Sequence, residues 1–175
     1  MEIPTNSVTE TERVGEAIGR AILAWPDAPH RSAQVLCIAL RGGLGAGKTQ
    51  LVRGIARGAA TADPSLVSSP TYVLMNEYRA AAHGLTVWHL DAYRVAGPDD
   101  FAAIGFEDLL RGDSGPGIVA LEWPERIEEL LPPDRLDIEI DRGDNENERL
   151  IRLSALGKLA PLLQRLQIPP APTPG

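Results

Sequence analysis

The chain has 175 residues, of which 43% are hydrophobic and 23% charged, and its formal net charge is −7. This size and composition predict one globular domain with a substantial core, and no apolar run approaches the length of a membrane span. The acidic balance argues against direct, tight binding of nucleic acid, which normally needs a basic patch. With a single cysteine and no basic signal-like start, we expect a cytoplasmic protein without disulfides.

The first expected helix covers residues 9–25, where apolar side chains recur at three- and four-residue steps. Ser7 or Thr9, each followed three residues later by a glutamate, can cap its start. Residues 35–40 then form a wholly apolar run, the pattern of a buried parallel strand. Cys37 within this run is expected to be a small core residue.

Residues 42–49, Gly-Gly-Leu-Gly-Ala-Gly-Lys-Thr, fit the phosphate-binding pattern of Gly, four residues, Gly, Lys and Ser/Thr. The glycines allow backbone amides to point at phosphate oxygens. Lys48 would neutralise charge on the β- and γ-phosphates, and the Thr49 hydroxyl would ligate Mg²⁺. The alternative is a glycine-rich turn with Lys48 as a solvated surface residue. The strand before it and the amphipathic helix expected over 50–60 favour the nucleotide site.

A loop over 62–70 precedes two strand-like runs, residues 72–78 and 85–90, which predict a hairpin. Thr71 follows Pro70 at the start of the first run. A hydroxyl in such a turn could meet a γ-phosphate or Mg²⁺, as in switch loops, or could simply cap the turn.

His89, Asp91 and Arg94 stand where the second of these strands ends, and ligands bind outside the carboxyl ends of strands in open α/β sheets. Asp91 and Arg94 are candidates for orienting water and stabilising phosphate charge. The alternative is a local ion pair, with His89 as an edge-strand or core residue. Short helices broken near Gly105 follow.

Residues 118–121 form an apolar run that ends in Glu122, the pattern of a parallel strand that delivers a carboxylate to Mg²⁺. Asp91 follows a similar run and competes for this role. We favour Glu122, because the strand before it is wholly apolar.

Residues 136–141 and 149–153 alternate in polarity, which predicts an antiparallel pair at one side of the sheet. Leucines from 156 to 166 mark a last helix, with Pro161 in its first turn or kinking it. We therefore expect a single domain over residues 1–166 and a proline-rich, disordered tail over 167–175.

Four motifs together resemble the TsaE family, the small bacterial ATPases required for threonylcarbamoyladenosine modification of transfer RNA. They are the loop over 42–49, Ser69-Pro70-Thr71-Tyr72, His89-Leu90-Asp91-Ala92-Tyr93-Arg94 and Leu121-Glu122-Trp123. The resemblance implies an α/β fold of the P-loop NTPase type, with three layers and a mixed, mostly parallel sheet that has an antiparallel edge. It also implies a slow ATPase that uses ATP and Mg²⁺ and acts with the TsaD and TsaB proteins, which install threonylcarbamoyl on the adenosine beside the anticodon.

By position, the resemblance assigns Thr49 and Glu122 to the metal and Thr71, Asp91 and Glu122 to catalysis. It assigns nucleotide binding to the residues of the loop, with adenine contacts near the chain start and in the last strand pair: Gly43, Leu44, Gly45, Ala46, Gly47, Lys48, Thr49, the Ser7–Val8 region and Arg149. The family loop usually has Asp where this chain has Gly43, which removes an acidic side chain near the site.

Two other functions share these features. A small-molecule or nucleotide kinase would use the same loop, but such enzymes usually close an arginine-rich lid, and no arginine-dense segment is evident. An interaction module in which ATP occupancy alone matters is the other alternative.

Overall fold

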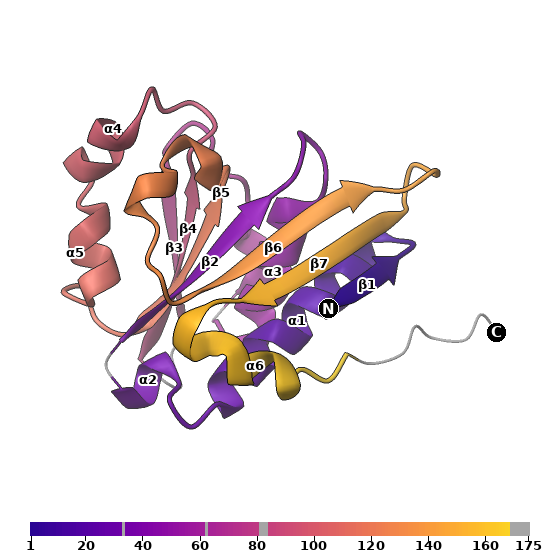
Figure 1. Cartoon of the computed structure of the whole chain (residues 1–175), viewed down its shortest axis with the longest axis horizontal. Helices are drawn as coiled ribbons and strands as arrows, with labels where there is room; N and C mark the ends of the chain where they lie inside the picture. The colour runs from indigo at the N-terminus through magenta and orange to yellow at the C-terminus, as the bar shows by residue number, and fades with distance from the viewer. Residues whose placement is uncertain (33, 62, 81–83, 169–175) are drawn as a thin grey trace.

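A seven-stranded sheet with the order β1-β7-β6-β2-β5-β4-β3 organises the chain (Figure 1). The computed structural model describes residues 1–32, 34–61, 63–80 and 84–168. The central strands β6, β2, β5 and β4 run parallel, whereas β3 and β7 are antiparallel to their neighbours and β1 pairs with β7. The strands are β1 (Glu2–Thr5), β2 (Val35–Arg41), β3 (Met75–Ala80), β4 (Leu85–Asp91), β5 (Gly117–Glu122), β6 (Arg135–Arg142) and β7 (Arg149–Ala155).

Helices cover both faces of the central strands, which gives the three layers expected (Figure 1). One face packs against α1 and α3, and the other packs against α4 and α5 over β2, β4 and β5. No described helix combines the length and hydropathy that a membrane span requires. The helices are α1 (Val8–Ala24), α2 (Pro29–Ser32), α3 (Lys48–Gly58), α4 (Pro98–Ala103), α5 (Phe106–Arg111) and α6 (Ala160–Gln164). The mixed α/β fold is confirmed, with antiparallel pairs at both edges of the sheet rather than one.

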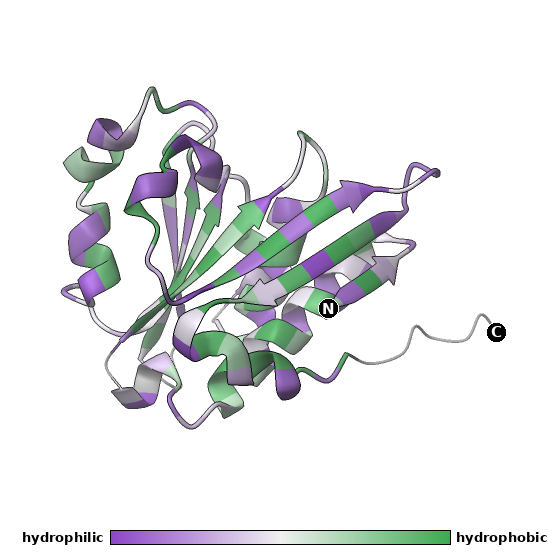
Figure 2. Cartoon of the chain, in the orientation of Figure 1, coloured by the Kyte–Doolittle hydropathy of each residue, from purple (hydrophilic) through white to green (hydrophobic). Residues whose placement is uncertain are grey.

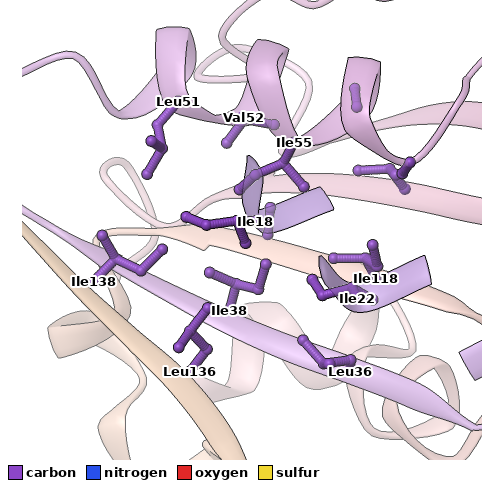
Figure 3. Close-up of a cluster of buried hydrophobic side chains, with 14 of the residues drawn as sticks. Ile18, Ile22, Leu36, Ile38, Leu51, Val52, Ile55, Ile118, Leu136 and Ile138 are labelled. Carbon is purple, nitrogen blue, oxygen red and sulfur yellow. The ribbon is translucent and has the colours of Figure 1, made fainter. Parts of the chain in front are cut away.

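Burial follows from this layering. Strands β2 and β5 are apolar almost throughout because helices lie on both sides, and Cys37 is a buried core residue as predicted. Hydrophobic and hydrophilic residues alternate along β6 and β7, because only one face of these strands packs against helices (Figure 2). In Figure 3, side chains of α1 and α3 pack against side chains of β2, β5 and β6. The helices contribute Ile18, Ile22, Leu51, Val52 and Ile55, and the strands contribute Leu36, Ile38, Ile118, Leu136 and Ile138.

Helices α1 and α3 approach each other closely because glycines line their contact. A Cβ on Gly54 would lie 2.0 Å from the carbonyl oxygen of Glu12, and a Cβ on Gly15, Gly19 or Gly58 would lie 2.2 to 2.4 Å from a carbonyl oxygen of the opposite helix. This contact fixes α1 against the helix that follows the phosphate loop.

The hairpin of β3 and β4 is confirmed, but β3 begins at Met75 rather than at Tyr72. The amides of Val73 and Leu74 donate to the carbonyl of Pro70, and Leu74 has φ of +67°. This turn bends the chain, so the pairing starts three residues later than the alternating sequence suggests. Residues 81–83 of the expected turn lie outside the described residues.

The remaining differences concern the chain ends. Edge strand β1 was not predicted, and the last helix is shorter than the leucine pattern suggests, with Pro161 in its first turn. Ile168, expected to belong to a tail that does not pack, is half-buried and packs against the larger core cluster. The rest of the expected tail, 169–175, lies outside the described residues.

Candidate nucleotide-binding site

The glycine loop connects β2 to α3, the strand–loop–helix arrangement that the motif requires. Gly42 has φ of +141°, and a Cβ there would lie 2.5 Å from the carbonyl oxygen of Ile140 on β6. Gly47 caps the start of α3 with φ of +107°. Both positions therefore need glycine, and they turn the backbone so that α3 begins at Lys48.

Lys48 is buried against the loop, with 4% of its surface exposed, so the solvated-lysine alternative is wrong. Its ammonium donates to the carbonyls of Gly42 at 2.7 Å and Gly43 at 3.1 Å, and lies 4.1 Å from the centre of the Trp123 ring. The Glu122 carboxylate is 4.0 Å away. Burial lowers the pKa of Lys48, and the nearby negative charges, Glu122 foremost, oppose that shift.

Glu122 receives two hydrogen bonds on one carboxylate oxygen. The Thr49 hydroxyl donates to Oε1 at 2.8 Å, and Nε2 of His89 lies 2.8 Å from the same oxygen. His89 is fully buried, and its Nδ1 has no partner among the described residues. Because a carboxylate oxygen can only accept a hydrogen bond, Nε2 of His89 is the donor of this pair. His89 is thus a core residue that also holds Glu122.

Asp91 holds the turn that contains Thr71. The hydroxyls of Thr71 and Ser69 donate to its Oδ2 at 2.5 and 3.3 Å, and the amide of Tyr93 donates to its Oδ1 at 2.8 Å. Asp91 is only 2% exposed. Thr71 therefore bonds the candidate catalytic carboxylate rather than only capping its own turn.

The alternative of a local ion pair for Arg94 is wrong. Asp91 and Arg94 form no salt bridge in the part of the chain that the structure describes. The Arg94 guanidinium lies instead over the exposed Tyr72 ring, 4.5 Å from its centre.

Strand register explains why these carboxylates lie together. Asp91 pairs with Glu122 between the parallel strands β4 and β5. Side chains two residues apart share one face of a strand, so His89 and Asp91 continue the face of Val87, which packs against α1 and α3. Glu122 continues the same face on β5. Both acids therefore end their strands beside the start of α3, the edge at which α/β sheets bind ligands.

The Arg149 side chain bonds the backbone of the loop, whereas the resemblance implied that it contacts adenine. Its Nε donates to the carbonyl of Ala46 at 2.8 Å and its Nη2 to that of Gly45 at 3.4 Å. Ser7 caps α1, its hydroxyl accepting from the amide of Glu10 at 3.2 Å, and Val8 is 52% exposed. Of the two regions expected to contact adenine, Arg149 hydrogen-bonds the loop, whereas within the described part of the chain no hydrogen bond joins Ser7 or Val8 to it.

Sequence reasoning missed Arg142, which donates to the carbonyl of Leu44 at 2.8 Å. It ends β6 before an acidic turn, and nothing local in the sequence marks it as a loop contact. Gly43, the position at which the loop departs from the pattern that it resembles, has open space around it: a Cβ there would meet no atom within 4 Å. The departure at Gly43 therefore leaves the packing of the loop intact.

Comparisons with known proteins identify the family. The family of threonylcarbamoyl adenosine biosynthesis protein TsaE matches residues 5–151. The TsaE protein of Haemophilus influenzae is 37% identical over 71% of this chain and 75% of its own, and that of Aquifex aeolicus is 34% identical over 87% and 94%. The crystal structure of Bacillus subtilis YdiB superposes with a TM-score of 0.67 at 25% identity, covering 95% of this chain and 93% of that one. The chain therefore belongs to the TsaE family, which takes part in the biosynthesis of threonylcarbamoyladenosine in transfer RNA.

Proposed function

We propose that the chain is a Mg²⁺-dependent, ATP-hydrolysing subunit that supports threonylcarbamoyl transfer to the transfer-RNA adenosine beside the anticodon. It acts in the cytoplasm with the TsaD and TsaB proteins. The observation that carries the proposal is the convergence of Lys48 and Thr49 with Glu122 and Asp91 at one edge of the sheet.

The oxygen atoms at this edge fit Mg²⁺. The Thr49 hydroxyl and the Glu122 carboxylate approach to 2.8 Å, and Mg²⁺ prefers oxygen ligands, usually one or two from protein with the rest from phosphate and water. When bound, Mg²⁺ would neutralise charge that develops on the phosphate oxygens.

Residues of the chain would bind the phosphates, orient the Glu122 carboxylate and orient the attacking water. Lys48 exchanges its two carbonyl acceptors for the β- and γ-phosphates, to which a buried ammonium is strongly attracted. Thr49 and Glu122 would hold Mg²⁺, and the bond from His89 would keep the Glu122 carboxylate oriented. Asp91 orients the attacking water, and Thr71 couples that carboxylate to the turn over residues 69–74.

Reconstituted modification tests this function. Transfer RNA, the TsaD–TsaB pair, threonylcarbamoyl donor and Mg·ATP are combined with the wild-type chain or with Lys48→Ala, and modified adenosine and released phosphate are both measured. We expect Lys48→Ala to lose both activities. Arg79→Ala is the control, because the Arg79 side chain is 82% exposed and lies on edge strand β3. Full modification by Lys48→Ala would contradict the proposal.

Two further measurements separate the alternatives. If Glu122→Gln binds ATP, hydrolyses none of it and still supports modification, the chain is an interaction module for which occupancy suffices. If label from γ-labelled ATP accumulates in a small molecule rather than in inorganic phosphate, the chain is a kinase.

A further inference from the structure

Two arginines from the hairpin of β6 and β7 reach back to the phosphate loop. Arg142 ends β6, Arg149 begins β7, and the two residues are directly opposed in the antiparallel register. Like charges directly opposite each other across two strands destabilise a sheet. Neither arginine forms a salt bridge within the described residues, although the turn between them is acidic. The carboxylate of Glu148, for example, accepts from Asn145 instead.

Both guanidinium groups donate hydrogen bonds to backbone carbonyls of the loop. Arg142 donates to Leu44 at 2.8 Å, and Arg149 donates to Ala46 at 2.8 Å and Gly45 at 3.4 Å. Gly45 permits the approach of Arg142, because a Cβ there would lie 2.5 Å from its Nη2.

Lys48 bonds the remaining carbonyls of the loop. It donates to the carbonyls of Gly42 and Gly43. Every carbonyl from Gly42 to Ala46 thus accepts a hydrogen bond from a cationic side chain. Three cations therefore hold five consecutive peptide groups of the loop.

We propose that Arg142 and Arg149 are positioning residues that clamp the phosphate loop in its anion-binding conformation. In a planar trans peptide, the C=O of one residue and the N–H of the next point in opposite directions. Holding the Leu44 and Ala46 carbonyls toward the hairpin therefore turns the amides of Gly45 and Gly47 toward the opposite side. When phosphate displaces Lys48 from the loop, the two arginines remain as its carbonyl partners.

This inference deepens the proposed function and rests on it for the ligand. It also assigns Arg149 a role other than contacting adenine, because its Nε, Nη1 and Nη2 all donate to carbonyls. Besides the loop, Nη1 donates to Glu146 at 2.6 Å and Glu148 at 2.7 Å, which ties the hairpin turn to the same guanidinium.

Calorimetric titration with ADP and with inorganic tripolyphosphate separates the two roles, because tripolyphosphate has a phosphate chain and no base. We expect Arg149→Ala to weaken both ligands by a similar factor, about tenfold for the loss of its loop bonds. Arg142→Ala should weaken both by about threefold, since it loses one exposed bond, and Arg142→Lys should recover much of that loss. Arg152→Ala is the control, an arginine on β7 that forms ion pairs with Glu2, Glu139 and Asp141 and not with the loop carbonyls. Weaker ADP binding with unchanged tripolyphosphate binding would overturn the clamp.

Amide hydrogen exchange of the nucleotide-free protein gives a readout that does not depend on the proposed function. The clamp predicts faster exchange in the peptide covering residues 42–49 for Arg142→Ala and Arg149→Ala, with unchanged exchange in α1. Arg152→Ala should match the wild type. Unchanged exchange of the loop in both variants would overturn the inference. Faster exchange together with a wild type that binds neither ligand would instead uphold the clamp and contradict the nucleotide site.

Discussion

Replacing Gly54 by alanine tests the packing that joins α1 to the phosphate-loop helix. The new Cβ would lie 2.0 Å from the carbonyl oxygen of Glu12 and 2.9 Å from the amide nitrogen of Glu16. A carbon and a carbonyl oxygen normally stay about 3.3 Å apart or more. The obstructing atoms are backbone, so no side-chain rotation relieves the clash, and the helices must separate within a close-packed core.

Two opposing terms set the size of the effect. Overpacking of a core costs up to about 3 kcal/mol. Alanine favours a helix over glycine by about 1 kcal/mol. The difference predicts a loss of about 2 kcal/mol of unfolding free energy, which for a chain of this size lowers Tm by about 4–8 °C.

Urea and thermal unfolding monitored by circular dichroism measure this loss. Gly97→Ala is the control, because Gly97 has extended backbone and a Cβ there would meet no atom within 4 Å. That variant should stay within about 0.5 kcal/mol of wild type. If Gly54→Ala were as stable as wild type or more so, helix propensity would outweigh packing, and the close contact of the two helices would not be what holds them.

Three further predictions concern buried side chains. Burial raises the pKa of the Cys37 thiol from 9.0 to about 12. The thiol of the unfolded chain therefore ionises first as the pH rises. Between pH 9 and 12 the wild type should lose up to about 1.4 kcal/mol of unfolding free energy per pH unit relative to Cys37→Ala. If urea unfolding gave the two proteins parallel profiles of unfolding free energy against pH, this prediction would be refuted. Asp91→Asn should slow phosphate release from Mg·ATP at least about a hundredfold while ATP affinity in calorimetry is retained, and unchanged release would remove Asp91 from catalysis. His89→Leu takes a donor from Glu122 and should lower Mg²⁺-dependent hydrolysis about tenfold. His89→Gln, whose amide can donate to the same oxygen, should retain most of it, and equal loss in both variants would indicate packing alone.

The sequence identified those parts of the site that short local patterns mark. The loop over 42–49 has a fixed spacing, and Asp91 and Glu122 each end an apolar strand beside that loop. Their neighbourhood followed from the rule that parallel strands present their carboxyl ends at one edge. The sequence already favoured Glu122 over Asp91, and strand order gives the physical reason that Glu122 is the acid bonded to Thr49: β5 lies beside β2, and β4 lies one strand further away.

The missed features depend on contacts distant in sequence. Arg142 contacts Leu44, 98 residues away, and only the pairing of β6 with β2 brings them together. Strand β1 is short, contains Pro4 and exists because β7 offers it an edge. The turn before β3 depends on two amides that share the carbonyl of Pro70, while the side-chain pattern alone resembles a strand.

Calorimetric titration of a non-hydrolysable ATP analogue, with and without Mg²⁺, tests the proposed phosphate and metal site most directly. In the wild type, Mg²⁺ should tighten binding. In Glu122→Gln, which removes the carboxylate beside Thr49 and Lys48, most of that tightening should be lost while the Mg²⁺-free affinity is no weaker. A Glu122→Gln variant that keeps the full effect of Mg²⁺ would contradict the assignment of this carboxylate to the metal.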